Sequence, residues 1–401
     1  MLDYTLKILL ISFYFPPDLS AGSFRAKALI DALRERGPAH LEIDVITTLP
    51  NRYSSLISSA SSLETIDGVT ITRLAIPSHK SGMTDQAKSF ISFAKQVGAV
   101  VGNRKWDVVV GTSSRLMTAA LSAAIAKKAN AALYLDIRDL FTDTIGDLLS
   151  KSPLKLAIPV MRLIEWLVFR SASRINIVSG GFLPHMRKIV PSHDYRIFTN
   201  GIDDEFLSGF DAKPEREIDK SSIVLYAGNI GDGQGLHNII PAAAGMLESQ
   251  AHFQLIGDGG RRKQLETELY ANAVINVEVR DPVPRNLLSQ YYKDADILFL
   301  HLNAQNAFLK VLPSKLFEYA ATGKPLLAGV AGHAADFITN EIPGAEVFAP
   351  CDAAGLVRAF ERLKSGPTHY DRKEFCKKYS RRAIMARMAD DILDLAHSVK
   401  K

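Results

Sequence analysis

Residues 309–325, LKVLPSKLFEYAATGKP, decide the fold of this 401-residue chain. The stretch follows an apolar run, residues 295–302, that is typical of a buried strand. We expect Ser314 to cap the helix that follows and Gly323 to end it. A second apolar run, residues 326–330, predicts the next strand. The stretch is therefore one strand–helix–strand unit of an α/β domain.

The same helix carries chemistry that suits a nucleotide. Ser314, Lys315 and Glu318 share one face at its start. Free N–H groups there and the Lys315 ammonium favour a phosphate, and Glu318 can accept hydrogen bonds from the vicinal hydroxyls of a ribose. The alternative is an ordinary capped helix with no ligand.

Apolar runs alternate with amphipathic runs along the rest of the chain. They predict strands at 6–13, 41–47, 69–74, 107–111, 132–137, 175–179, 195–199, 222–227, 251–256 and 274–279. They predict helices at 24–36, 85–101, 115–129, 154–172, 181–189, 236–248, 261–271, 284–293, 353–365 and 381–400. A polar stretch, residues 208–222, interrupts the pattern. We therefore predict two doubly wound Rossmann-like domains, 1–205 and 206–380, with a cleft between their carboxyl edges.

Composition narrows the cellular context. Two cysteines in 401 residues give neither a disulfide framework nor metal-ligand spacing, so a reducing cytosol is expected. The first apolar run is too short for a secretory leader, and no run reaches the ~18 residues of a membrane span.

Charge is unevenly distributed. Residues 1–200 carry 24 Lys and Arg against 16 Asp and Glu, a balance of +8, and the remainder carries 24 against 27, or −3. The basic half favours binding to an anionic membrane surface. We do not expect nucleic acid as a partner. The apolar stretch 154–169, which contains Trp166, predicts either a helix at that surface or one packed on its own sheet.

Three glycine-containing turns follow predicted strands. Gly22 opens the first helix and predicts either a tight turn or the close approach of an anion. The loop 228–235, GNIGDGQG, places Gly228, Asn229, Gly231 and Gln234 before a helix and favours phosphate approach. Gly257 begins the third turn.

Charged residues also follow strands. Arg261, after Gly257, starts a basic run that either meets an anion or forms a solvated face. Arg138 and Asp139 follow the strand 132–137, where the carboxylate can meet a hydroxyl or form a local ion pair. The sequence shows neither a nucleophilic triad nor a metal-binding pattern, so neither a cofactor nor a metal is expected.

These features together resemble the GT-B retaining glycosyltransferases of glycosyltransferase family 4, in the bacterial O-antigen and capsule branch that includes L-fucosamine-transferase-like proteins. The resemblance covers nearly the whole chain. It rests on Gly22 and Arg25, on the motifs at 136–139, 200–203, 226–236 and 257–259, and on Pro313–Glu318 with 323–325.

The resemblance implies a metal-independent enzyme that moves a sugar from a nucleotide-diphosphate donor to an undecaprenyl-diphosphate-linked saccharide. We expect the donor to be a UDP-linked N-acetylated amino sugar. It implies that Gly22, Pro313, Ser314, Lys315, Leu316 and Glu318 line the donor site. Asp139, Lys315 and Glu318 would take part in catalysis, and Arg25 and Arg138 would lie on the acceptor side. It also implies that residues 381–401 return to the first domain. We expect a cytoplasmic protein that is either free or peripheral at the inner face of the plasma membrane.

Three positions depart from the family pattern. Lys310 replaces a glutamate eight residues before Glu318, and Asn229 and Gln234 replace two cations of the glycine loop. We therefore expect the charge that neutralises the diphosphate to come from Lys310, Lys315, Arg261 or Arg262, or from Arg25 across the cleft. Two rival interpretations stay open: a GT-B epimerase or sugar-phosphate synthase, and a nucleotide-binding partner subunit without activity.

Overall fold

The computed structural model describes residues 5–18, 20–50, 60–77, 83–113, 115–143, 156–207 and 221–398. The chain forms two compact units. The first combines Met1–Asn200 with Arg381–Lys401, and the second is Gly201–Ser380. The boundary expected between residues 205 and 206 lies close to this division. The predicted linker, 208–222, falls almost entirely outside the described residues.

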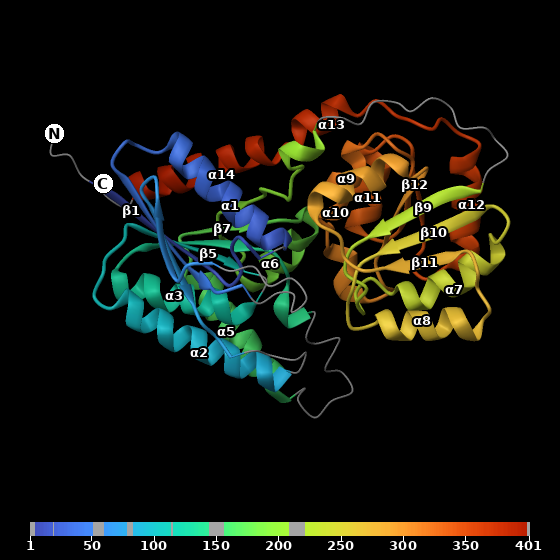
Figure 1. Ribbon diagram of the computed structural model, residues 1–401. Helices are drawn as coiled ribbons and strands as arrows, with labels where there is room; N and C mark the ends of the chain where they lie inside the picture. Colours follow the sequence, from blue (N-terminus) through green and yellow to red (C-terminus); the bar gives the residue numbers. More distant parts are fainter. Residues whose placement is uncertain are drawn as a thin grey trace. The chain divides into compact units, whose positions relative to one another are not determined.

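One sheet organises the first unit (Figure 1). Its strands are β1 (Leu6–Ser12), β2 (Leu41–Thr48), β3 (Leu63–Ile66), β4 (Val69–Leu74), β5 (Val108–Ser113), β6 (Ala132–Ile137), β7 (Arg174–Ile177) and β8 (Tyr195–Arg196). Their order is β3-β4-β2-β1-β5-β6-β7-β8, with only β3 antiparallel to its neighbour among the pairs described. All six residues of β5 and of β6 are buried, as expected for strands covered on both faces.

The helices of the first unit come from both ends of the chain. They are α1 (Ala21–Arg36), α2 (Met83–Val101), α3 (Leu116–Ala129), α5 (Ile158–Ser171), α6 (Leu183–Ile189) and α14 (Arg381–Ser398). The C-terminal helix α14 packs against α1. Asp391 of α14 accepts hydrogen bonds from Tyr134 at 3.0 Å, Arg174 at 2.7 Å and Arg196 at 2.9 Å. These charged bonds fix the end of the chain to β6, β7 and β8.

Arg25 lies in the interior of the first unit and is only 1% exposed. Its Nε and Nη2 donate to the two carboxylate oxygens of Asp136 at 2.8 and 2.9 Å. Nη1 donates to the Thr199 carbonyl and Nη2 also to the Phe198 carbonyl. The guanidinium of Arg25 is therefore enclosed by the fold and satisfied by internal partners, and its acceptor-side role stays a prediction.

A second parallel sheet organises the second unit, in the order β11-β10-β9-β12-β13-β14. Its strands are β9 (Ser222–Ala227), β10 (Ala251–Ile256), β11 (Val277–Arg280), β12 (Ile297–His301), β13 (Leu326–Gly329) and β14 (Ala345–Phe348). Its helices are α7 (Leu236–Met246), α8 (Arg262–Ala271), α9 (Arg285–Asp294), α10 (Lys315–Ala321), α11 (His333–Glu341), α12 (Ala353–Lys364) and α13 (Lys373–Lys378). Its core includes Phe253, Phe299, Leu327 and Phe360.

Four elements were not predicted from the sequence: β3, α11, β14 and α13. β3 lies at the sheet edge with three of its four residues exposed, so it has no apolar run to reveal it. β14 is only four residues long and mostly half-buried. The strand predicted at 195–199 is reduced to β8, because the carbonyls of Phe198 and Thr199 accept from Arg25 instead.

Replacing Arg25 with Ala should destabilise the first unit by about 3–5 kcal/mol, because Asp136 would be left buried without its cation. Both tryptophans, Trp106 and Trp166, belong to this unit, so urea titration followed by tryptophan fluorescence measures its unfolding.

Lys27→Ala is the matched control. Lys27 pairs with Asp31 on the exposed side of the same helix, and its loss should cost less than about 0.5 kcal/mol. Equal unfolding midpoints for the two variants would show that the Arg25–Asp136 pair does not hold this unit together.

Candidate nucleotide-sugar site

The candidate donor site lies at the carboxyl edge of the second sheet. β9 pairs with β10 on one side and with β12 on the other, so the chain connections diverge at β9. Ligands of doubly wound sheets bind at such a switch point. The loops that follow these three strands, together with helix α10, carry every candidate residue of the second unit.

Missing side chains allow these loops to pack closely. A Cβ at Gly257 would lie 1.8 Å from the Gly228 carbonyl oxygen, and a Cβ at Gly228 would lie 2.4 Å from Cε of Lys315. A Cβ at Gly231 would likewise meet the Asn229 amide at 2.3 Å. Gly257 therefore lets backbone meet backbone, whereas Gly228 and Gly231 make room for the side chains of Lys315 and Asn229.

Lys315 and Glu318 form the charged centre of the site. Burial lowers the pKa of Lys315, the neighbouring Glu318 carboxylate opposes that shift, and Arg285 adds to it. Glu318 is 15% exposed along its side chain and accepts a hydrogen bond from the Tyr292 hydroxyl at 3.2 Å. Arg285 lies 3.5 Å from its other oxygen. The result is a half-enclosed cation and carboxylate on one helix.

Sequence reasoning missed the residues that support Glu318. Arg285 also forms ion pairs with Asp203 and Glu205 and lies over the Phe206 ring at 4.9 Å. Asp203 belongs to the motif at 200–203, which was recognised without a role. No spacing in the sequence relates these residues to Arg285, about 80 positions later, so only the folded chain reveals the cluster.

Tyr319 fastens the candidate helix to the sheet. Its hydroxyl accepts from the Ala227 N–H at 2.9 Å and lies 3.2 Å from the Ala227 carbonyl oxygen, to which it donates. Burial raises the pKa of Tyr319 above its ordinary value, so the hydroxyl stays protonated. This bond sets the position of Lys315 relative to the loop that starts at Gly228.

The start of α10 differs from the expected capped helix. Ser314 has helical backbone angles, and its side chain makes no capping hydrogen bond. The N–H groups of Leu316 and Phe317 donate to the carbonyls of Pro313 and Ser314 in a tight turn. Leu316 is fully buried, so its side chain belongs to the core. The anion attraction expected of this helix start therefore rests on Lys315.

The glycine loop is held by polar side chains. Asn229 donates to Gln234 at 2.8 Å, which joins the two positions where the family pattern has cations. Arg261 donates to Asp232 at 3.0 Å and to Gln264 at 2.9 Å. Arg261 thus has a partner in Asp232, although both side chains are exposed, and its role as a counter-charge of the diphosphate stays a prediction.

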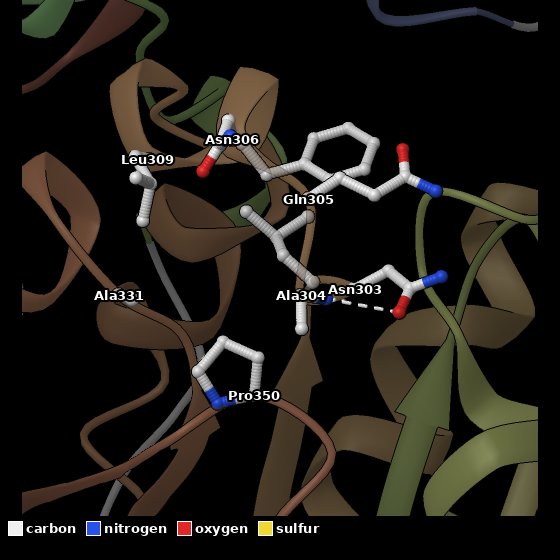
Figure 2. Close-up of a pocket in the computed structure, with 9 residues that line it drawn as sticks. Asn303, Ala304, Gln305, Asn306, Leu309, Ala331 and Pro350 are labelled. Atoms are coloured by element: carbon white, nitrogen blue, oxygen red, sulfur yellow. Dashed lines mark hydrogen bonds between the residues drawn. The ribbon is translucent and has the colours of Figure 1, made fainter. Parts of the chain in front are cut away.

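A pocket of about 170 Å³ opens beside this loop (Figure 2). It is lined by Leu302, Asn303, Ala304, Gln305, Asn306, Phe308, Leu309, Ala331 and Pro350. Asn303 closes the wall on the loop side, because its N–H donates to the Gly233 carbonyl and its amide to the Asp232 carbonyl, both at 2.9 Å. Lys310 follows at the end of the 3₁₀ helix η4 (Asn306–Lys310) and is half-buried. The pocket is smaller than the ~300–1,000 Å³ of a whole ligand site, so it suits one part of a ligand.

His301 forms a hydrogen bond with the glycine loop 228–235. Its Nε2 accepts from the Cys351 N–H at 2.9 Å, so its Nδ1 is the nitrogen that donates to the Gln234 carbonyl at 2.6 Å. Burial lowers the pKa of His301 to about 4. The imidazole is therefore neutral near pH 7 and serves to position Gln234.

The candidate residues of the first unit gather at the start of α1. Ser20 caps this helix by accepting from the Ser23 N–H at 3.2 Å. A Cβ at Gly22 would lie 2.0 Å from Nη1 of Arg138, so the guanidinium lies directly over the helix start. Its buried Nε finds no hydrogen-bond partner among the described residues. A cation at a helix N-terminus is unfavourable alone and is complementary to an anion.

Asp139 lies next to this cation and is half-buried. Burial raises the pKa of its carboxyl to about 6, against the opposing effect of Arg138. The group therefore changes charge close to physiological pH. Among the described residues, no cluster of His, Cys, Asp and Glu side chains is arranged to hold a metal ion.

Two doubly wound α/β units in one chain are the architecture of the GT-B fold class. In this protein each unit also carries charged groups at the carboxyl edge of its sheet. Solved structures of this class match nearly the whole chain. HepE of Anabaena, in complex with UDP and glucose, has a TM-score of 0.66 over 97% of this chain and 100% of that one, at 14% identity. WaaG, a glycosyltransferase involved in lipopolysaccharide biosynthesis, has a TM-score of 0.67 over 96% and 99%, at 15% identity.

Comparisons of the amino-acid sequence give similarity to glycosyl transferases. The family model described as Glycosyl transferases group 1 matches residues 209–383, nearly all of the second unit. WcaI of Escherichia coli (strain K12), named as a candidate colanic acid biosynthesis glycosyl transferase, is 33% identical over 105 residues. That match spans about a quarter of each chain, 26% in both cases.

The raised pKa of Asp139 predicts a pH-dependent stability difference. Between about pH 4 and 6 the unfolded chain ionises this carboxyl while the folded chain keeps its proton, so stability falls as pH rises. Asp139→Asn removes the titration. The midpoint of wild type minus that of the variant, from tryptophan fluorescence melts, should fall across this window and level off above it.

One outcome would contradict this prediction. A midpoint difference that stays constant from pH 4 to 7 would mean that the Asp139 carboxyl is not destabilised by burial. Asp143→Asn, four residues along, serves as the control for removing a carboxylate near this strand end.

Proposed function

We propose that this protein is a retaining glycosyltransferase of bacterial surface polysaccharide synthesis. It would transfer an N-acetylated amino sugar from a UDP-linked donor to an undecaprenyl-diphosphate-linked saccharide of an O-antigen or capsule. The carrying observation is the Lys315 cation seated against Gly228, with Glu318 one turn along the same helix. The group 1 family match over the second unit, and the UDP bound by HepE, support the same assignment.

The donor would extend along the edge of the second sheet. Its diphosphate would meet Lys315 and the backbone of the loop at Gly228, with Lys310 supplying further charge. Its ribose would donate to Glu318, whose two oxygens keep lone pairs beyond those facing Tyr292 and Arg285. The pocket between Asn303 and Pro350 offers amides and apolar surface to another part of the donor.

The transfer step places negative charge on the leaving diphosphate. The bond between the anomeric carbon and the diphosphate oxygen breaks, and the acceptor oxygen bonds to the same face of the sugar. The acceptor proton passes to the leaving diphosphate. Lys315 would stabilise the growing charge, which fits a mechanism without a metal. Asp139 would orient the acceptor hydroxyl, and Arg138 over Gly22 would hold a nearby anionic group.

A non-catalytic nucleotide-binding subunit is the second candidate function. It is favoured by the neutral Asn229–Gln234 pair, which occupies both cation positions of the glycine loop. Binding of UDP without turnover of any donor, in the presence of a lipid-linked acceptor, would support this alternative over the enzyme.

Lys315→Ala should lower the rate of donor turnover by about 10²–10³, because a cation aimed at developing charge contributes most in the transition state. Radiolabelled sugar transfer to a lipid-linked acceptor measures the rate, and a thermal melt confirms the fold. Lys373→Ala, whose lysine is 89% exposed elsewhere on this unit, should leave the rate unchanged. Full activity in the Lys315 variant would remove the assigned role.

Glu318→Ala should weaken UDP binding by about tenfold or more, because a buried carboxylate that receives ribose hydroxyls is lost. Calorimetric titration with UDP measures the affinity directly. Glu341→Ala is the control, since Glu341 forms an ion pair with exposed Lys378 and is not among the candidate site residues. An unchanged affinity in the Glu318 variant would place the ribose elsewhere.

A further inference from the structure

Helix α5 of the first unit exposes an apolar ridge to solvent. The exposed fractions are 81% for Leu156, just before the helix, 60% for Val160, 56% for Leu163 and 52% for Leu167. The spacing of four, three and four residues places these side chains on one face of the helix. The opposite face, Glu165, Val168 and Phe169, is buried. The helix is thus apolar on the side that faces water as well as on the side that faces its own unit.

The charges of α5 are arranged asymmetrically. Its only carboxylate, Glu165, is 1% exposed and accepts a hydrogen bond from Thr142 inside the unit. Arg162 and Arg170 are exposed beside the ridge. The Arg170 guanidinium lies 5.1 Å from the ring centre of Trp166, which is itself partly exposed. The outward side therefore presents aliphatic side chains with two cations and an indole along one border.

We propose that the ridge Leu156–Val160–Leu163–Leu167 docks this protein onto an anionic lipid bilayer. Aliphatic side chains would enter the boundary between headgroups and acyl chains, and Trp166 would lie at headgroup level. Arg162 and Arg170 are long enough to reach lipid phosphates from the helix border. No carboxylate of α5 faces outward to repel them.

The charge of the whole unit selects an anionic lipid over a second copy of the chain. Residues 1–200 contribute +8, and residues 381–401 add five basic against three acidic side chains, so the unit carries +10. Two copies meeting through this face would bring two such charges together. An anionic bilayer would instead be attracted.

Docking would be peripheral. Among the described helices, none is long and apolar enough to cross a membrane. α5 is 14 residues long and is anchored by its buried face, including Phe169, and by packing against α3. The inference bears on the proposed function, since a lipid-linked acceptor would be presented at that surface. Its test is a binding measurement that needs neither donor nor transfer.

The experiment uses the full chain and vesicles of phosphatidylcholine with and without 30% phosphatidylglycerol. Co-sedimentation measures the bound fraction, and the emission of Trp166 should shift to the blue on binding, whereas Trp106 is already buried. Leu163→Glu with Leu167→Glu should reduce the partition coefficient about tenfold or more. Arg162→Gln with Arg170→Gln should reduce it about fivefold for each charge removed, and only at low salt.

The matched control is Tyr270→Glu with Ile275→Glu in the second unit, where the side chains are 90% and 76% exposed. This variant should bind vesicles like the wild type. The proposal is overturned if wild type ignores anionic vesicles, or if the two leucine substitutions leave binding intact. It is also overturned if those substitutions instead dissociate a dimer in light scattering. Vesicle binding with no sugar transfer would contradict only the proposed function.

Discussion

The candidate site depends on the close approach of two loops at the edge of the second sheet, which Gly257 and Gly228 permit. Gly257 has no Cβ, so its main chain can touch the Gly228 carbonyl, and Gly228 has none, so Lys315 can lie against it. Tyr319 holds the helix in place through both polar groups of Ala227. Loop, turn and helix are therefore positioned mutually, and the cation has little freedom to leave.

The two units differ in how an enclosed arginine is paired with carboxylates. In the first unit Arg25 and Asp136 satisfy each other almost completely, with Asn176 donating to the same carboxylate at 2.7 Å. In the second, Arg285 is shared among Asp203, Glu205 and Glu318. A shared cation leaves oxygens of Glu318 with capacity for another donor, which is the property that a hydroxyl-binding carboxylate needs.

Sequence patterns predicted most of the fold because parallel strands buried on both faces are continuous apolar runs. β6, β9 and β10 begin and end where the apolar runs predicted. Short or edge elements such as β3 and β14 were missed, since β3 is mostly exposed and β14 mostly half-buried, so neither leaves such a run.

Site residues were harder to predict, since local sequence does not record long-range partners. Lys315 and Glu318 lie one turn apart, so their common face could be predicted from helical spacing alone. Arg25 was assigned to an acceptor because nothing near it in sequence announces Asp136, 111 positions later. Arg285 and Tyr292 were missed for the same reason, as their contacts with Glu318 exist only after folding.

The return of α14 to the first unit has a consequence for synthesis on the ribosome. The second unit is one continuous segment, Gly201–Ser380, whereas the first receives its helix α14 only after the whole second unit has been translated. Asp390 and Asp391, the partners of Arg36, Arg174 and Arg196, are translated after the second unit. The nascent first unit therefore lacks the contacts that α14 makes with α1, β5 and β6 while the second unit emerges. Chaperone demand should accordingly concentrate on Met1–Asn200, the segment that has to wait for α14.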